Sequence, residues 1–240
     1  MKPIKGFSKP APKKPPSGIG AWVVHKSSQL IAFSKPAALA VQTARTDQPS
    51  LQKLASAYAK RDLYLLHRID QPASGLVLFG RHKAKAGQLQ RQFADGTASR
   101  TYLAIVEGEP TAPEGELTQH LTHDARANKA KVVDAGTEGA KASALHWRTL
   151  GSTDKYRVVE VRLTTGRPHQ IRVQLASVGM PIHGDVKYGA RRSNANRGIH
   201  LHSYRLSLKH PVSGQAVDLE APLPADDALW AAAAGVVEAQ

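Results

Sequence analysis

Cysteine is absent from the 240 residues of this chain. Its absence excludes disulfide bonds, thiolate metal sites and cysteine nucleophiles, and it is compatible with a reducing compartment. Acidic residues are scarce as well: 19 aspartates and glutamates stand against 33 lysines and arginines, which gives a formal net charge of +14. A surplus of this size favours an anionic partner, nucleic acid before an anionic membrane surface, over an ordinary protein that happens to have a basic surface.

Long hydrophobic runs are also missing, since none approaches the roughly 18 residues of a membrane-spanning helix. The basic N-terminus lacks the apolar core of a signal peptide. We therefore expect a cytoplasmic protein without a membrane partner. Residues 1–18 hold five lysines, five prolines and no acid, a composition typical of a disordered arm. Such an arm could follow the phosphates of a nucleic acid or be a solvated tail without a role.

The apolar pattern of residues 19–240 predicts short strands and a few helices in a single domain. Residues 157–164 alternate between apolar and polar side chains, as a half-buried strand does. The segments with helical patterns are 51–59 after Ser50, 82–93, 169–178, and an Ala-rich stretch after Asp226 or Asp227. Residues 109–142 have weak periodicity and predict loops and short hairpins. Because strands outnumber helices without strict βαβ order, the fold class is α+β, with a mixed, mostly antiparallel sheet and flanking helices.

The most informative stretch is residues 65–78, where a charged segment separates two apolar runs. His67, Arg68 and Asp70 follow the first run, and a turn containing proline, serine and glycine leads into the second. A strand that ends in charged residues and turns back can hold a reactive side chain on a rigid scaffold. Asp70 is therefore a candidate catalytic carboxylate, with an ordinary aspartate of a surface turn as the alternative.

A second segment, residues 164–175, carries a glycine turn and then a helix rich in hydrogen-bond donors. Arg167 and His169 lie at the N-terminus of this helix, where backbone amides and the helix dipole favour phosphate or carboxylate groups. Arg172 lies further along, beside core positions, so it needs a buried partner. Asp70 is a candidate for that partner, and another acid is the alternative.

Two further segments combine reactive side chains with structural signals. Tyr102, in the strand-like residues 100–108, is either a core residue or a phenol that faces a site and stacks on a base. Residues 179–189 contain three glycines and a proline and describe a tightly specified loop. His200 and His202 fall on one face of a later strand, but no second histidine pair or carboxylate stands at a ligand spacing, so metal is the weaker interpretation.

Taken in chain order, these segments resemble the motifs of the RluA-type pseudouridine synthase family. The matching segments are residues 34–37, 67–76, 100–104, 165–172, 179–189 and 210–224. The second of them resembles the catalytic motif of the family, the third its tyrosine motif and the fourth its arginine motif. Any one match is weak, but the ordered set, which spans residues 30–224, is specific.

The resemblance implies a pseudouridine-synthase fold with a central active-site cleft, and residues 19–240 as one catalytic domain. It points to the short form of the family, without an S4-type RNA-binding domain before the match. The implied reaction is the isomerisation of uridine to pseudouridine in ribosomal or transfer RNA, with the target base flipped out of the RNA. No cofactor or metal is implied. Structured RNA is the implied partner, and we expect a monomer.

By the same resemblance, Asp70 is the catalytic carboxylate, Arg172 its charged partner, and Tyr102 the residue that stacks on the flipped uracil and helps to move the C5 proton. The residues implied to bind RNA are His67, Arg68, Arg167, His169 and Gln170. Ala73 departs from the pattern, because the family usually has a threonine there. We expect this change to affect the turn or the substrate fit rather than the reaction.

Two other classes of function fit parts of the same sequence. One is an RNA-binding chaperone or assembly factor that has the same fold but in which catalysis is dispensable, which the charge and the basic arm favour. The other is a metal-dependent phosphoesterase that uses the histidines. The three hypotheses differ in whether Asp70 is required and in whether a chelator abolishes activity.

Overall fold

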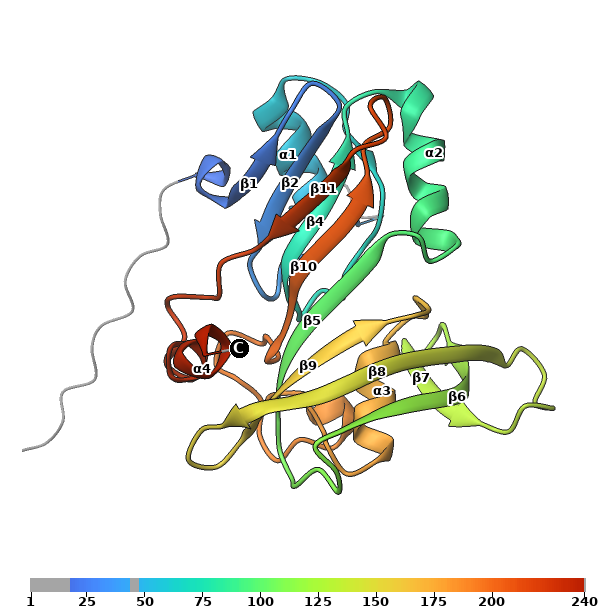
Figure 1. Cartoon of the computed structure of the whole chain (residues 1–240), viewed down its shortest axis with the longest axis vertical. Helices are drawn as coiled ribbons and strands as arrows, with labels where there is room; N and C mark the ends of the chain where they lie inside the picture. Colours follow the sequence, from blue (N-terminus) through green and yellow to red (C-terminus); the bar gives the residue numbers. More distant parts are fainter. Residues whose placement is uncertain (1–17, 44–47, 240) are drawn as a thin grey trace, which may run out of the picture.

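The structure, a computed structural model, describes residues 18–43 and 48–239 (Figure 1). The expected N-terminal arm therefore lies outside the described residues, apart from Gly18. The strands are β1 Val23–Lys26, β2 Leu30–Lys35, β3 Tyr64–Leu65, β4 Ser74–Gly80, β5 Ser99–Val106, β6 Glu114–Asp124, β7 Lys129–Val133, β8 Lys141–Ser152, β9 Arg157–Leu163, β10 Leu201–Lys209 and β11 Ala216–Glu220. The helices are α1 Leu51–Ala59, α2 Lys83–Ala94, α3 Gln170–Ser177 and α4 Ala228–Glu238, with short 3-10 turns at Ile19–Trp22 and Val186–Tyr188.

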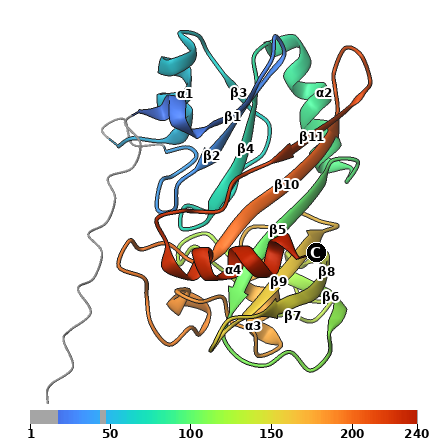
Figure 2. The ribbon, with the colours of Figure 1, turned by 60° about the vertical axis from the view of Figure 1, so that its left-hand side comes forward.

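The strands of the described chain form one continuous sheet in the order β1-β2-β4-β10-β5-β9-β8-β6-β7, with β11 beside β10 and β3 beside β4. The pair β4–β10 is parallel and the other pairs are antiparallel. The long strand β5 lies at the centre and links the half with α1 and α2 to the half with α3 and α4 (Figure 2). The expected α+β fold with a mixed, mostly antiparallel sheet is confirmed.

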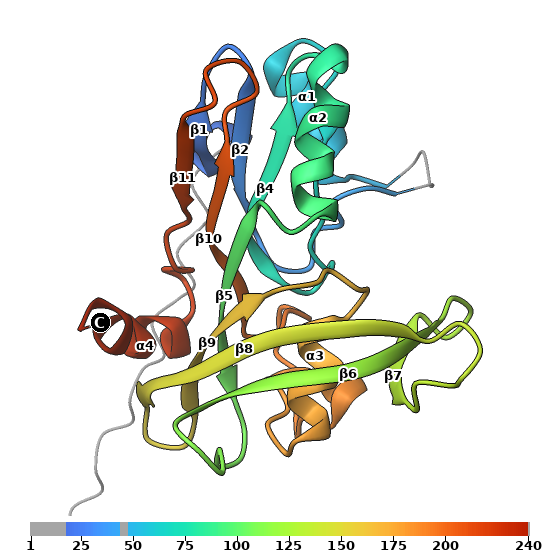
Figure 3. The same cartoon turned by 45° about the vertical axis from the view of Figure 1, so that its right-hand side comes forward.

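The two faces of the sheet bury separate apolar clusters, because successive side chains of a strand point to opposite faces. On β5, Tyr102 and Ala104 belong to the cluster that includes α1 and α3. Leu103 and Ile105 point the other way and pack against Trp230 of α4. Helices α3 and α4 accordingly lie on opposite sides of β5 and β9 (Figure 3). The face of α1 and α3 is the one that carries Tyr102.

Two of the predicted helix starts have the capping bonds that the sequence suggests. The Ser50 side chain accepts from Lys53 N at the start of α1. Asp227, rather than Asp226, caps α4 by accepting from Leu229 N and Trp230 N. These bonds satisfy amides that have no partner within the helix.

The prediction of loops and short hairpins over residues 109–142 is wrong in one respect. The segment contains the 11-residue strand β6, and the long strand β8 begins at its end, at Lys141. β6 alternates between exposed and partly buried side chains, and Leu121 is its buried residue. A strand near the sheet edge that exposes one face to solvent needs few apolar residues. The apolar–polar alternation of its sequence is therefore weak.

Gly75 in β4 lies where that strand meets β10. Its φ is +104°, and a Cβ at this position would overlap Ser203 O and lie 2.6 Å from Ser203 N. We expect Gly75→Ala to lower the free energy of unfolding by about 2–4 kcal/mol, because a positive φ and a backbone clash are both unfavourable for alanine. Urea unfolding measures the change.

Gly87 in α2 is the matched control, because nothing lies within 4 Å of a Cβ built there. Gly87→Ala is expected to stabilise the protein by about 0.5–1 kcal/mol. A Gly75→Ala variant as stable as the wild type would show that β4 and β10 can move apart without cost.

Candidate active site

Asp70 lies in the connection between β3 and β4, on the face of the sheet that carries Tyr102. It lines a cavity of about 290 Å³ whose other walls come from β5 and from the segment leading into α3. The preceding Ile69 is buried in the core. The amide of Ala73 donates to Asp70 O at 3.1 Å and closes the turn. The turn is therefore intact with alanine at position 73, without the hydroxyl of a threonine.

The side chain of Lys35 contacts the backbone of this turn. Lys35 is 1% exposed, and its Nζ lies within hydrogen-bonding distance, 2.6–3.1 Å, of four carbonyl oxygens, those of Gln71, Ala73, Pro36 and Leu39. Burial lowers the pKa of Lys35 to about 7, although the charge of Asp70 opposes that change. One buried amine thus joins the loop after β2 to the loop that carries Asp70. This contact gives a physical reason for the Lys-Pro segment noticed in the sequence.

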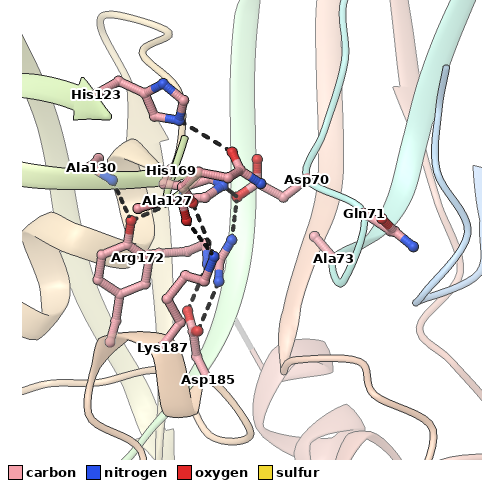
Figure 4. A network of polar contacts seen from close by, with 12 residues as sticks. Asp70, Gln71, Ala73, His123, Ala127, Ala130, His169, Arg172, Asp185 and Lys187 are labelled. Carbon is pink, nitrogen blue, oxygen red and sulfur yellow. Dashed lines mark hydrogen bonds and ion pairs between the residues drawn. The ribbon is translucent and has the colours of Figure 1, made fainter. Parts of the chain in front are cut away.

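The structure brings Arg172 and Asp70 together, as Figure 4 shows. Arg172 Nη1 donates to Asp70 Oδ2 at 3.0 Å. The stronger partner is Asp185, which accepts from Nε at 2.7 Å and from Nη2 at 2.8 Å. Burial by itself would lower the pKa of Arg172, but the bonds and charges of Asp185 and Asp70 raise it above its ordinary value. The guanidinium stays charged, fixed by one acid and free to orient the other.

His169 stands beside the same carboxylate. Its Nε2 lies 3.9 Å from Asp70 Oδ2, and its Nδ1 lies 2.8 Å from the Tyr188 hydroxyl. That hydroxyl also accepts from Ala130 N at 2.8 Å. If it donates its own proton to Nδ1, the proton of a neutral imidazole lies on Nε2 and faces Asp70. Burial lowers the pKa of His169; the charge of Asp70 opposes this and that of Arg172 adds to it. These effects favour a neutral imidazole.

Hydrogen bonds and ring contacts hold the turn between β6 and β7 next to this site. Lys187 Nζ donates to Ala127 O at 3.3 Å and to Asn128 O at 3.0 Å. His123 contacts both the Asn128 side chain, at 3.2 Å, and the His169 ring edge. Residues of the 179–189 loop therefore hold the hairpin against the cavity, a role that its glycines and proline do not reveal by themselves.

Tyr102 forms part of the cavity wall and is 6% exposed. Burial raises the pKa of Tyr102, while Arg100 and a hydrogen bond with Ser203 oppose the rise. The phenol therefore keeps its proton at neutral pH. The ring of Tyr102 gives the cavity a flat apolar surface. Its hydroxyl group can carry a proton within the cavity.

Of the other predicted RNA-binding residues, some are exposed at the cavity and others are buried. Arg68 and Arg167 are exposed at the cavity, and Arg167 Nε donates to Ala142 O at 3.1 Å. Gln170 is buried, and its amide is used by protein groups: Oε1 accepts from Thr165 Oγ1 and Arg167 N, and Nε2 donates to Ala144 O. Gln170 thus shapes the loop that presents Arg167.

The structure does not bring His67 to the cavity. Its Nε2 accepts from Leu78 N at 3.1 Å, and its ring stacks on Phe93 of α2 at 4.7 Å. Burial, with a smaller contribution from Arg100, lowers the pKa of His67 to about 3. His67 is a packing residue between the β3–β4 segment and α2.

Replacing His67 is expected to change how stability depends on pH. The unfolded chain binds the imidazole proton below about pH 6.5, whereas the folded chain excludes it down to about pH 3. Stability is therefore lost as the pH falls through this window, by about 2–3 kcal/mol between pH 7 and 4.5. Urea unfolding of His67→Gln at both pH values should lack that part of the loss, with the exposed His82→Gln as control. An equal loss in His67→Gln and the wild type would contradict the assignment.

The histidines weighed as metal ligands have other partners. His200 Nε2 lies 3.0 Å from Asp227 Oδ1, and His202 Nδ1 lies 2.8 Å from Ser74 Oγ. Across residues 18–43 and 48–239, no group of three or more His, Asp or Glu side chains is placed to hold a metal ion. In the same ranges, no helix is long and apolar enough to cross a membrane.

Known proteins resemble this chain in fold or in sequence. The fold agrees with that of the human RNA pseudouridylate synthase domain containing 4 protein, with a TM-score of 0.72 over 92% of this chain and 94% of that one, at 22% identity. An uncharacterized RNA pseudouridine synthase of Bacillus subtilis, YhcT, is 31% identical over 85% of this chain and 69% of its own length. Ribosomal large subunit pseudouridine synthase C of Rickettsia conorii is 30% identical over 85% of this chain and 68% of its own length.

A family model described as RNA pseudouridylate synthase matches residues 29–177. This range holds the turn of Asp70, the strand of Tyr102 and the helix of Arg172. The cavity and its lining therefore lie largely within the part of the chain that carries the likeness. The chain belongs to the RNA pseudouridylate synthase family of isomerases.

Proposed function

We propose that this protein isomerises a specific uridine of a structured RNA, ribosomal or transfer, with Asp70 as the essential catalytic carboxylate. The observation that carries the proposal is the Asp70–Arg172 bond of 3.0 Å in a cavity that also contains Tyr102. Relatives named for the large ribosomal subunit support ribosomal RNA as the first target to examine.

The reaction needs no redox partner, because it only exchanges one bond for another. The N1–C1′ bond of uridine breaks, the uracil rotates, a C5–C1′ bond forms, and the C5 proton is lost while N1 gains one. A carboxylate that acts on the sugar or on the base must lie beside C1′ and C2′ in a fixed orientation. The Arg172 guanidinium, itself fixed by Asp185, provides that orientation for Asp70.

Tyr102 is proposed to stack on the flipped uracil and to help transfer the C5 proton. Burial raises the pKa of Tyr102 and keeps the phenol protonated in the free protein. In this role the phenol would therefore give its proton to the base and take the C5 proton in exchange. Arg68 and Arg167, both exposed at the cavity, are proposed to bind the RNA around the extruded base, and Arg68 to fill the gap that the base leaves. His169 and Gln170 are proposed to position these groups.

The test is carbodiimide mapping of pseudouridine in total cellular RNA, with and without the gene. The expected result is one or a few sites that disappear on deletion and return when the gene is restored. Purified protein should then form pseudouridine at the same sites in RNA from the deletion strain. An unchanged map together with an inactive purified protein would contradict the proposal.

A further inference from the structure

Arg100 is a buried cation that pairs with no acid among residues 18–43 and 48–239. Its side chain lies in the wall of the cavity and is 8% exposed, and its Nε and Nη2 atoms are enclosed without a hydrogen-bond partner. In the described part of the chain, no hydrogen bond or ion pair engages its guanidinium. Arg172, the other buried arginine of the cavity, has two carboxylates. A charge enclosed in this way disfavours folding unless something pairs with it.

The backbone directs Arg100 toward the site. It lies two residues before Tyr102 on β5, and alternate residues of a strand share one face. Both residues line the cavity. On the opposite wall, Gly166 leaves the space that the guanidinium occupies, because a Cβ there would overlap Arg100 Nη1. The glycine turn before α3 thus makes room for a guanidinium that has no hydrogen-bond partner in the described part of the chain.

The surroundings indicate which group would satisfy Arg100. Asp70, the acid that lines the cavity, already accepts from Arg172, and Arg68 and Arg167 add two more positive charges. A neutral uracil would supply a carbonyl oxygen but no countercharge. A phosphodiester supplies both a charge and the paired acceptor oxygens that a planar guanidinium binds best.

We propose that Arg100 is the phosphate-binding residue of the active-site cavity and pairs with a phosphodiester of the flipped nucleotide. The inference rests on the proposed function, because the phosphate comes from the RNA substrate. Arg100 is then left without a partner in the free protein and gains one when the nucleotide enters. The buried charge becomes a means of discriminating a nucleotide from a free base or nucleoside.

The first experiment follows the Nε–H signal of Arg100 by NMR, identified by its loss in Arg100→Lys. The probes are uridine 5′-monophosphate, uridine and inorganic phosphate. The monophosphate and phosphate are expected to shift the signal in a saturable way, and uridine to leave it unchanged. The Arg205 signal, whose guanidinium is bound by Glu220, is the internal control. A shift with uridine equal to that with the monophosphate, or no shift with any probe, would overturn the proposal.

The second experiment separates binding from folding. Arg100→Met keeps the length of the side chain but removes an unpaired charge, so its urea midpoint should equal or exceed that of the wild type. The KM for the mapped RNA should rise about 10- to 100-fold, with a smaller change in kcat, as expected for the loss of a charged hydrogen bond. Arg100→Lys should recover part of the KM. A clear drop in the urea midpoint of Arg100→Met would mean that the residue serves the fold, against the proposal.

Neither the NMR titration nor the urea midpoint requires turnover. A protein that binds the monophosphate through Arg100 but forms no pseudouridine would contradict the proposed function and leave this inference standing. If the wild type and Arg100→Met form pseudouridine equally well, the proposed function stands and the inference about Arg100 is contradicted.

Discussion

Asp70→Asn is expected to reduce pseudouridine formation by roughly a thousandfold or more, the scale seen when a central catalytic group is removed. Asparagine has nearly the shape of aspartate, and its amide oxygen can still accept from Arg172 Nη1. It lacks the negative charge that attack on the sugar or base, or removal of a sugar proton, requires. Single-turnover assays on the mapped RNA, read out by carbodiimide, measure the rate.

Asp62→Asn is the matched control, since this exposed aspartate lies in the same segment, just before β3. It should retain the wild-type rate, and both variants should unfold at similar urea concentrations. Wild-type turnover by Asp70→Asn would remove Asp70 from its assigned role. Complementation adds a separate answer: if Asp70→Asn repairs every defect of a deletion strain, RNA binding rather than catalysis is the function that matters there.

Arg172→Met is expected to lower the free energy of unfolding by about 3–5 kcal/mol, because it leaves buried charge without a partner. The side chain of Asp185 is 2% exposed and has both oxygens bound by Arg172. Removing the guanidinium also frees Asp70, so turnover should fall with stability. Urea unfolding and the single-turnover assay measure the two effects.

A double variant separates these two effects of Arg172. Adding Asp185→Asn to Arg172→Met removes the stranded charge and should restore much of the lost stability, because neighbouring substitutions of this kind are not additive. It should not restore turnover, since Asp70 still lacks its orienting partner. If stability and turnover returned together, Arg172 would act on the reaction only through the fold.

The local elements were largely predictable from the sequence. The capping residues Ser50 and Asp227 satisfy amides of their own helices, so their signal needs no distant residue. The strands around Asp70 were predictable for a similar reason, because apolar runs and a turn specify them. The strand β6 was not, because near the sheet edge it buries little apart from Leu121, and its partner strands hold it in place.

The candidate site likewise has features that the sequence predicts and features that it does not. The amino-acid sequence by itself determined the charge surplus, the family motifs and the choice of Asp70, Tyr102 and Arg172. It gave no signal that Asp185 is the main partner of Arg172, that His67 packs on Phe93, or that Arg100 has no partner among the residues that the structure describes. Each of these depends on side chains that are distant in sequence or belong to different elements.

Asp70 itself illustrates the boundary between the two. The motif around residue 70 identifies a reactive carboxylate, because turn residues and charge are local properties of the chain. Its orientation depends on Arg172, 102 residues away, and on the amine of Lys35 beneath its turn. Only the tertiary structure decides these contacts, because a hydrogen bond or an ion pair requires a distance of about 3 Å, which the folded sheet provides and the sequence does not encode locally.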